Sequence, residues 1–213
     1  LKYMHVVSSS AGVDYRLRDR LIVTLQGFYK AYGDIPLSLR DDIPLTCKGN
    51  DYGTVGDEPL VSEADGRAYG LEAMVRWQIA GRVNVIGSAT LYSSEYRRGR
   101  GDRYIASAWD NRFVVNVSGT YDFGRHWSAG AKLSAIGGAP YTPYDVELSS
   151  LKQAWDAQGR PYYDYSRYNS ERLPAFAQLD VRVDKVFYFK RWMLGFLSLI
   201  HISEPTRPRL ISY

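Results

Sequence analysis

Four arginines gather in one short segment near the middle of the chain: Arg97, Arg98, Arg100 and Arg103. A guanidinium group binds a carboxylate or a phosphate through two parallel N–H donors, so a cluster of this kind suits an anionic ligand. The alternative interpretation is a solvated loop whose charges meet only water. The segment therefore marks a candidate anion-binding loop, and both interpretations stay open.

Four tyrosines follow Pro161 closely: Tyr162, Tyr163, Tyr165 and Tyr168. A tyrosine ring can stack on a flat ligand, while its hydroxyl group binds a polar partner. The alternatives are that these rings only fold their own loop, or that they extend a belt of interfacial aromatic side chains. The segment is a second candidate for ligand contact.

A third group of charged residues alternates with apolar ones: Glu72, Arg76, Asp180, Arg182 and Asp184. Side chains alternate between the two faces of a strand, so these charges share a face that their apolar neighbours avoid. A row of charges in a dry core carries a heavy desolvation cost. We expect a hydrated wall along which acids and arginines pair with one another. Ligand contact and the outer face of a soluble sheet are the alternatives.

The sequence shows no arrangement that suggests catalysis. It contains no nucleophile motif, no phosphate-binding loop and no pair of carboxylates placed for acid–base chemistry. Cys47 is the only cysteine, so no disulfide framework and no cysteine metal site exist, and a free loop thiol is expected. His5, His126 and His201 are too scattered to suggest a metal site. We predict no enzymatic activity, no cofactor and no metal.

The charge pattern argues against a nucleic-acid partner. The net charge is +4, from 27 basic and 23 acidic residues, and the two signs are interspersed along the chain. A nucleic-acid-binding domain concentrates basic residues on one face. We therefore predict no nucleic-acid binding.

The elements that carry these residues are strands. Residues 113–135 contain two runs of strict alternation, with Phe113, Val115 and Val117 on one face and Asn116 and Ser118 on the other. Each run is about ten residues long, which is roughly the length that crosses a bilayer as a tilted strand. The turn between the runs is short, so this segment predicts a transmembrane β-hairpin.

The same alternation recurs along the chain. It predicts eight strands, over residues 11–17, 21–29, 67–78, 83–92, 113–123, 127–135, 175–187 and 192–196. Short turns join them in pairs, and long segments without periodicity separate the pairs, over residues 33–66, 93–111 and 136–174. Long loops on one rim and short turns on the other are typical of an outer-membrane barrel. No apolar run is long enough for a transmembrane helix. We predict an all-β fold, an antiparallel transmembrane β-barrel that is only partial.

Both ends of the chain look incomplete. The first residue is Leu1, and no signal peptide opens a protein that would have to be exported, so we expect the start to be missing. Residues 197–207, LSLIHISEPTR, match one reading frame of a common transposon-based sequencing adapter, and the closing ISY fits its continuation. We therefore expect the barrel to occupy residues 1–196 and residues 197–213 to be a non-native tail. A genuine irregular tail is the alternative.

Three segments resemble the C-terminal barrel of TonB-dependent receptors, in the form found in the Bacteroides group. They are GRAYGLE at residues 66–72, IGGAPYTP at residues 136–143 and RLPAFAQLDVRVD at residues 172–184. The resemblance covers residues 1–196. It implies a barrel of about 22 strands around an N-terminal plug. This chain would supply about eight consecutive strands, which in isolation form an open curved sheet.

The resemblance also implies a function. The parent protein would be a receptor in the outer membrane of a Gram-negative bacterium, taking up a siderophore-bound iron, a cobalamin or a glycan. Its partners would be outer-membrane lipid, the plug domain of the same chain, TonB and an unknown imported ligand. In that setting the arginine segment could instead bind lipopolysaccharide phosphate. The alternatives are a small independent barrel with a structural or adhesion role, and a soluble β-rich binding protein.

Overall fold

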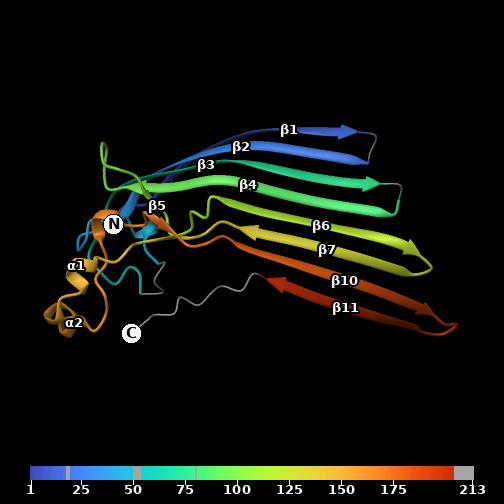
Figure 1. Cartoon of the computed structure of the whole chain (residues 1–213). Coiled ribbons are helices and arrows are strands. Elements are labelled where there is room, and N and C mark those ends of the chain that lie inside the picture. The colour runs from blue at the N-terminus through green and yellow to red at the C-terminus, as the bar shows by residue number, and fades with distance from the viewer. Residues whose placement is uncertain (18–19, 50–53, 80, 204–213) are drawn as a thin grey trace.

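One antiparallel sheet forms most of the structure, a computed structural model that describes residues 1–17, 20–49, 54–79 and 81–203 (Figure 1). Its long strands are β1 (His5–Leu17), β2 (Leu21–Ser38), β3 (Leu60–Ile79), β4 (Val83–Arg97), β6 (Phe113–Gly124), β7 (Trp127–Ile136), β10 (Phe176–Tyr188) and β11 (Met193–Ser203). They pair in that order, each with the next. The eight expected strands are therefore present as consecutive up-and-down neighbours.

Shorter elements lie between the long strands. They are 3-10 helix η1 (Leu45–Cys47), strand β5 (Ile105–Ala106), strand β8 (Pro140–Tyr141), helices α1 (Val146–Ser149) and α2 (Lys152–Gln158), 3-10 helix η2 (Tyr165–Arg167) and strand β9 (Glu171–Arg172). β5 pairs with β4, and β8 pairs with β9. The helices and β5 gather at one end of the sheet, here called the loop end, and the hairpin turns lie at the other, the turn end (Figure 1). No helix among the described residues has the length and hydropathy needed to span a bilayer.

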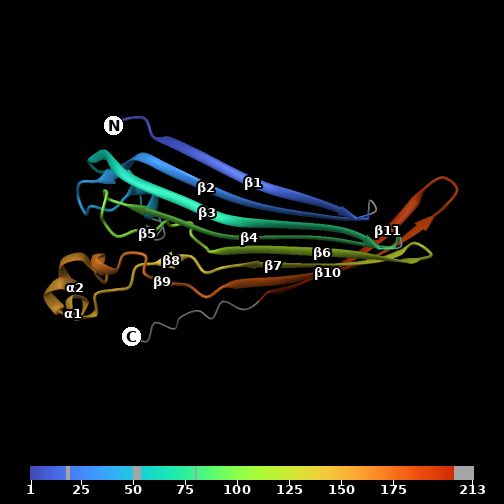
Figure 2. The same cartoon turned by 90° about the horizontal axis from the view of Figure 1, so that it is seen from above.

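The sheet is open. In the described part of the chain β1 pairs only with β2 and β11 only with β10, so the two edge strands do not meet. Figures 1 and 2 show β1 on one side of the curved sheet and β11 on the far side beyond β10. A closed eight-stranded barrel would pair its first and last strands. This confirms the prediction of a partial barrel that forms an open sheet.

The register of the strands separates an apolar face from a polar one. One row across all eight long strands contains Tyr15, Val23, Val75, Gly87, Val117, Leu133, Leu179 and Ile202. The adjacent row, on the opposite face, contains Asp14, Thr24, Met74, Ser88, Asn116, Ser134, Gln178 and Ser203. Since alternate residues point to opposite faces, the period-2 pattern of the sequence becomes two chemically distinct surfaces.

Aromatic side chains gather at the turn end. Phe189 stacks on Trp192 with ring centroids 3.8 Å apart, and Tyr121 meets Phe123 edge-on at 4.6 Å. The Lys185 ammonium group lies 5.0 Å from the Trp127 ring. Rings with a polar or cationic neighbour are characteristic of a membrane–water interface. The turn end therefore has the aromatic composition that is typical of an interfacial rim.

Strands β2 and β3 are longer than expected. The sequence predicted a loop over residues 33–66, but β2 continues to Ser38 and β3 begins at Leu60. The pairing shifts register between Tyr32 and Ile35 and again at Pro36, and Asp34 has a positive φ of 55°. A bulge of this kind puts the alternation out of phase, so the periodicity vanishes although the strand continues.

The buried core lies at the loop end. It comprises Ile35, Leu37, Ile43, Cys47, Ala64 and Tyr96. Tyr96 follows Ser88 and Thr90 on the polar face of β4, so the segment after β2 folds over that face. Gly66 lies opposite Tyr96, and a Cβ atom there would overlap the tyrosine ring. The connecting segment is thus a packed subdomain rather than a loose loop.

Strand β11 also differs from expectation. The sequence predicted that regular structure would end near Phe196, but β11 pairs with β10 without interruption as far as Ser203, opposite Gln178. Leu197, Ser198 and Leu199 continue the strand because β10 offers them an unbroken edge. Residues 204–213, the remainder of the expected tail, lie outside the described residues.

Candidate functional site at the loop end

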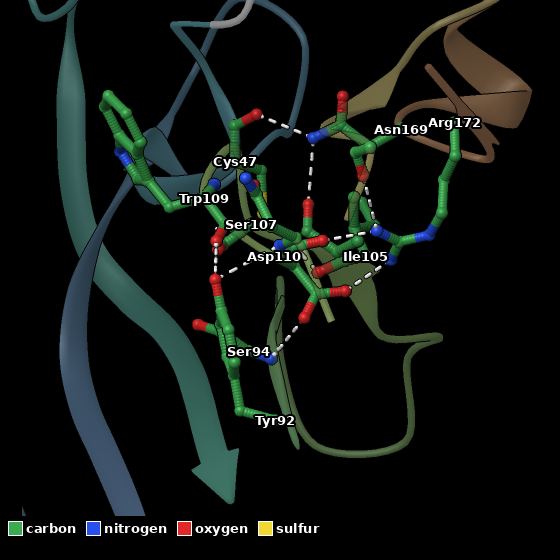
Figure 3. A network of polar contacts seen from close by, with 12 residues as sticks. Cys47, Tyr92, Ser94, Ile105, Ser107, Trp109, Asp110, Asn169 and Arg172 are labelled. Atoms are coloured by element: carbon green, nitrogen blue, oxygen red, sulfur yellow. Dashed lines mark hydrogen bonds and ion pairs between the residues drawn. The ribbon is translucent and has the colours of Figure 1, made fainter. Parts of the chain in front are cut away.

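A buried ion pair joins two of the connecting segments. The Asp110 side chain, in a residue only 2% exposed, accepts hydrogen bonds from the Arg172 guanidinium group and from the backbone N–H of Ser94 at 2.9 Å. Arg172 also donates to the carbonyls of Asp110 and Gly138. Figure 3 shows the two charged groups pointing toward each other. Because the carboxylate is buried and the guanidinium group, only partly exposed, makes several hydrogen bonds, the pair fixes the segment after β5 against β9.

Asn169 joins three segments. Its side-chain amide donates to the carbonyls of Cys47 and Ala106, each at 2.8 Å (Figure 3). Its backbone N–H donates to the Thr142 hydroxyl at 3.1 Å. Asn169 has a φ of 52°, in the left-handed region that asparagine tolerates better than most residues. All three long connections of the loop end therefore meet at one amide.

A charged network holds the segment after β2. The Lys48 ammonium group contacts Asp41 at 2.7 Å and Glu58 at 2.6 Å, and the Ser38 hydroxyl donates to Glu58 at 2.5 Å. Burial opposes the charge on Glu58, but the hydrogen bonds from Lys48 and Ser38 outweigh it and lower its pKa. Burial likewise opposes the charge on Lys48, and the two carboxylates outweigh it and raise its pKa. Both groups are thus held in their charged forms.

Cys47 lies beneath this network. The thiol is free and fully buried, and its sulfur contacts the carbonyl of Ile105 at 3.6 Å. Burial raises its pKa to about 12. The sequence predicted a free loop thiol, and the structure places it in the core, where it is protonated and unreactive.

A pocket of about 330 Å³ opens beside this assembly. Its charged lining residues are Glu95, Arg103, Asp110, Arg112, Arg167 and Arg172. Arg172 is bound to Asp110, and Arg167 pairs with Glu171. Among the described residues, neither Arg103 nor Arg112 has an ion-pair partner. The pocket lining therefore includes two exposed arginines without an ion-pair partner, and it suits an anion.

The structure separates the four predicted arginines. Arg97 pairs with Asp65 at 3.5 Å and lies over the Tyr104 ring, and Arg98 pairs with Asp42 at 3.0 Å and with Asp102 at 3.3 Å. Both therefore hold the fold together. Arg100 is exposed in a turn. Only Arg103 lines the pocket. Contact between any of them and a ligand stays a prediction.

The structure also places the four predicted tyrosines in two separate pairs. Tyr163 stacks on Tyr144 with ring centroids 5.2 Å apart. The backbone carbonyl of Tyr162 accepts a hydrogen bond from the N–H of Asp145, and the N–H of Tyr162 donates to the Ser149 hydroxyl. Tyr165 and Tyr168 stack on each other at 6.0 Å and both line the pocket. The first two therefore lie within their own loop, and the second two belong to the same pocket lining as Arg103.

The charged residues of the polar face pair in part. Arg182 contacts Asp184 at 2.8 Å, while Asp180 contacts His201 at 2.6 Å and accepts from Gln178. Glu72 and Arg76 lie on the same face of β3, but in the described part of the chain neither forms an ion pair. Arg182 and Asp184 therefore form an acid–arginine pair on β10, whereas the β3 charges have Gln26, Thr90, Ile22 and Ile86 as cross-strand neighbours. The lumen-facing role of these residues stays a prediction.

Sequence reasoning missed Tyr104, Asp110, Arg112, Asn169 and Arg172. Asp110 and Arg172 are 62 residues apart, and Asn169 and Cys47 are 122 apart. No local period links such positions. Their only signal was the unusual richness of both loops in arginine and tyrosine. No group of three or more potential metal ligands occurs in the ranges that the structure covers.

Comparisons with known proteins agree with the fold. A family model described as "TonB dependent receptor-like, beta-barrel" matches residues 1–199. Among solved structures, the ferric-catecholate import receptor Fiu of E. coli K12, in a closed form, matches with a TM-score of 0.57 and 14% identity. The match covers 86% of this chain and 21% of that receptor, so the chain spans about a fifth of its length. No curated protein matches.

The family model extends three residues past Phe196 and otherwise covers the range in which the resemblance was found. The open sheet, its two faces and its loop and turn ends are what that family requires of consecutive barrel strands. The chain therefore belongs to the TonB-dependent receptor-like β-barrel family.

Proposed function

We propose that this chain is part of an outer-membrane receptor that takes up a scarce, large nutrient with energy delivered through TonB. The observation that carries the proposal is the family match over residues 1–199, combined with a sheet that is apolar on one face and polar on the other. The apolar face contacts lipid, and the polar face lines a hydrated lumen that a plug domain of the same parent chain occupies. Ferric siderophores, cobalamins and glycans are the candidate cargoes.

The loop end faces the outside of the cell in this proposal. Three long connections packed into one hydrogen-bonded unit suit an extracellular rim, because a receptor must present its ligand contacts on a rigid scaffold. The wall charges Glu72, Arg76, Asp180, Arg182 and Asp184 then lie along the route of the cargo. No bond in the cargo needs to break during passage, so the chain needs no catalytic group.

The open edges favour this reading over a small independent barrel. Among the residues that the structure covers, β1 and β11 each expose a row of unpaired backbone groups, which neighbouring strands of a larger barrel would satisfy. A soluble role is disfavoured by the exposed leucines and valines on one face. Leu71 and Leu91, adjacent across β3 and β4, are 56% and 57% exposed.

Deletion of the complete parent gene tests the proposal. Cells that lack it should fail to grow when one nutrient of a candidate class is limiting, and the complete gene should restore growth. Removal of TonB should cause the same defect, because uptake needs the energised partner. Normal growth on ferric siderophores, cobalamin and glycans alike, or recovery of the parent protein in the soluble fraction, would contradict it.

A further inference from the structure

Three successive rows on the apolar face change character toward the loop end. The first row contains Ala11, Gly27, Leu71 and Leu91, the second contains Ser9, Tyr29, Tyr69 and Ser93, and the third contains Val7, Ala31, Arg67 and Glu95. Rows on the same face are about 7 Å apart. On β3 and β4 the surface therefore passes from apolar to aromatic to charged within about two steps, as at a membrane–water interface, while Val7 and Ala31 keep the third row apolar on β1 and β2. Tyr29 and Tyr69 stack at this boundary with centroids 6.5 Å apart.

The pocket with the unneutralised arginines lies on the charged side of that boundary. Ser93 and Glu95 of the apolar face form one of its walls, and Arg103 and Arg112 belong to the same lining. Nearby, the Arg67 guanidinium group lies 4.0 Å from the Tyr104 ring centroid and pairs with Glu95. Glu95 is thus already neutralised, which leaves the positive charge of Arg103 and Arg112 available to an anion.

An apolar groove lies on the other side. It is shallow and largely open, with a volume of about 590 Å³, and is lined by residues of β1, β2 and β3, among them Ala11, Gly27 and Leu71. Gly27 has no side chain to fill the groove. A Cβ atom there would lie 3.5 Å from the Leu71 side chain, which is an ordinary van der Waals distance. Tyr69 lines the groove and its register partner Ser93 lines the pocket, so the two hollows are neighbours.

We propose that the pocket and the groove together bind one phosphorylated lipid of the outer leaflet. Its phosphate is held by Arg103 and Arg112, and an acyl chain lies along the groove over Gly27. A free anion would use the pocket alone and gain nothing from the apolar hollow beside it. The proposal rests on the proposed placement in the outer membrane, and it assigns this face a role separate from cargo transport.

The test uses the complete receptor, purified in a neutral detergent and titrated with mixed micelles that contain diphosphoryl lipid A. The double variant Arg103→Gln/Arg112→Gln should bind these micelles about tenfold more weakly or worse, because two charge-assisted contacts are lost. Arg100→Gln is the control for a loss of positive charge alone, since it removes one arginine from an exposed position outside the pocket lining. Gly27→Leu should also weaken micelle binding, by filling the groove.

The arms of the experiment separate the possible results. Equal binding by the double variant and the Arg100→Gln control overturns the proposal. Competition by inorganic phosphate at the affinity of the lipid, with no effect of Gly27→Leu, also overturns it and assigns the pocket to a soluble anion. A heat-modifiable band on gels shows that each variant is folded. Failure of the wild-type receptor to insert into membranes would instead overturn the proposed function itself.

Discussion

The side-chain amide of Asn169 donates a hydrogen bond to the backbone carbonyl of Cys47 at 2.8 Å, across 122 residues of sequence. The same nitrogen serves the carbonyl of Ala106, so one side chain satisfies acceptors on two other segments. Buried carbonyls without a partner carry a substantial free-energy cost, so this amide decides whether the loop end packs as a unit.

Replacing Asn169 with alanine should loosen the loop end. Two acceptors lose their donor, at about 1 to 3 kcal/mol each, and the left-handed backbone loses a residue suited to it. Cys47 reports the change, because its buried thiol, with a pKa of about 12, should resist maleimide in the wild-type receptor and react in Asn169→Ala. Gln158→Ala is the control: that amide also serves two carbonyls, but locally and in water. Equal labelling of all three proteins would refute the prediction.

Breaking the pair between Asp110 and Arg172 should be more damaging. Arg172→Met leaves a buried carboxylate without its cation, and loss of one partner from a buried pair costs about 3 to 5 kcal/mol. The exposed pair between Arg167 and Glu171 offers the comparison, since Arg167→Met should cost about 1 kcal/mol or less. Protease resistance of the loop end in the folded receptor measures both. An Arg172→Met receptor as resistant as Arg167→Met would show that the pair adds nothing.

The network around Glu58 should make the segment between β2 and β3 sensitive to acid. The pKa of Glu58 is lowered in the fold, so its stabilising effect is complete above the ordinary value of 4.5 and disappears as pH falls through the lower folded value. Lys48, whose pKa is raised, acts oppositely: its effect is complete below 10.5 and disappears as pH rises through the folded value.

Hydrogen exchange of residues 39–49 and 54–59, corrected for intrinsic rates, checks this. Exchange in the wild-type receptor should accelerate below about pH 4.5, while Glu58→Gln should exchange fast already at neutral pH and show a weaker acid dependence. Glu147→Gln, an exposed acid in another segment, serves as the control. If the acceleration of exchange at low pH is the same in Glu58→Gln as in the wild-type receptor, the Glu58 carboxylate is not its cause.

Much of the sheet could be predicted because its rule is local. Alternation places Phe113, Val115 and Val117 on one face, and a lipid-facing strand has no other way to arrange them. The alternation rule fails where a bulge shifts its phase, as at Asp34. The last residues of β2 and the first residues of β3 were therefore predicted to be a loop.

The candidate site was harder to predict because long-range contacts determine which of several identical side chains are paired with an acid. Arg97, Arg98 and Arg103 are alike in sequence, yet Asp65 and Asp42 neutralise the first two and leave the third in the pocket. Which arginine finds an acid depends on loop packing that Asn169 and Asp110 set from elsewhere in the chain. The composition of the sequence indicated which loops carry the candidate site, but only the fold could identify the residues that line the pocket.

The last strand carries a prediction about the sequence itself. In β11 Leu199 lies opposite Arg182 and Leu197 opposite Asp184, so two leucines enter the polar face that β10 fills with charges. Up to Phe196, which lies opposite Lys185 at the turn end, the strand is that of a receptor wall. We propose that residues 197–213 are adapter-encoded and that the natural gene departs from this sequence after Phe196. Long-read sequencing of the locus should reveal a different continuation, with polar residues in the places of Leu197 and Leu199. An uninterrupted gene that encodes SEPTR and ends at Tyr213 would refute this, and the two leucines would then require a neighbouring strand or plug residue to cover them.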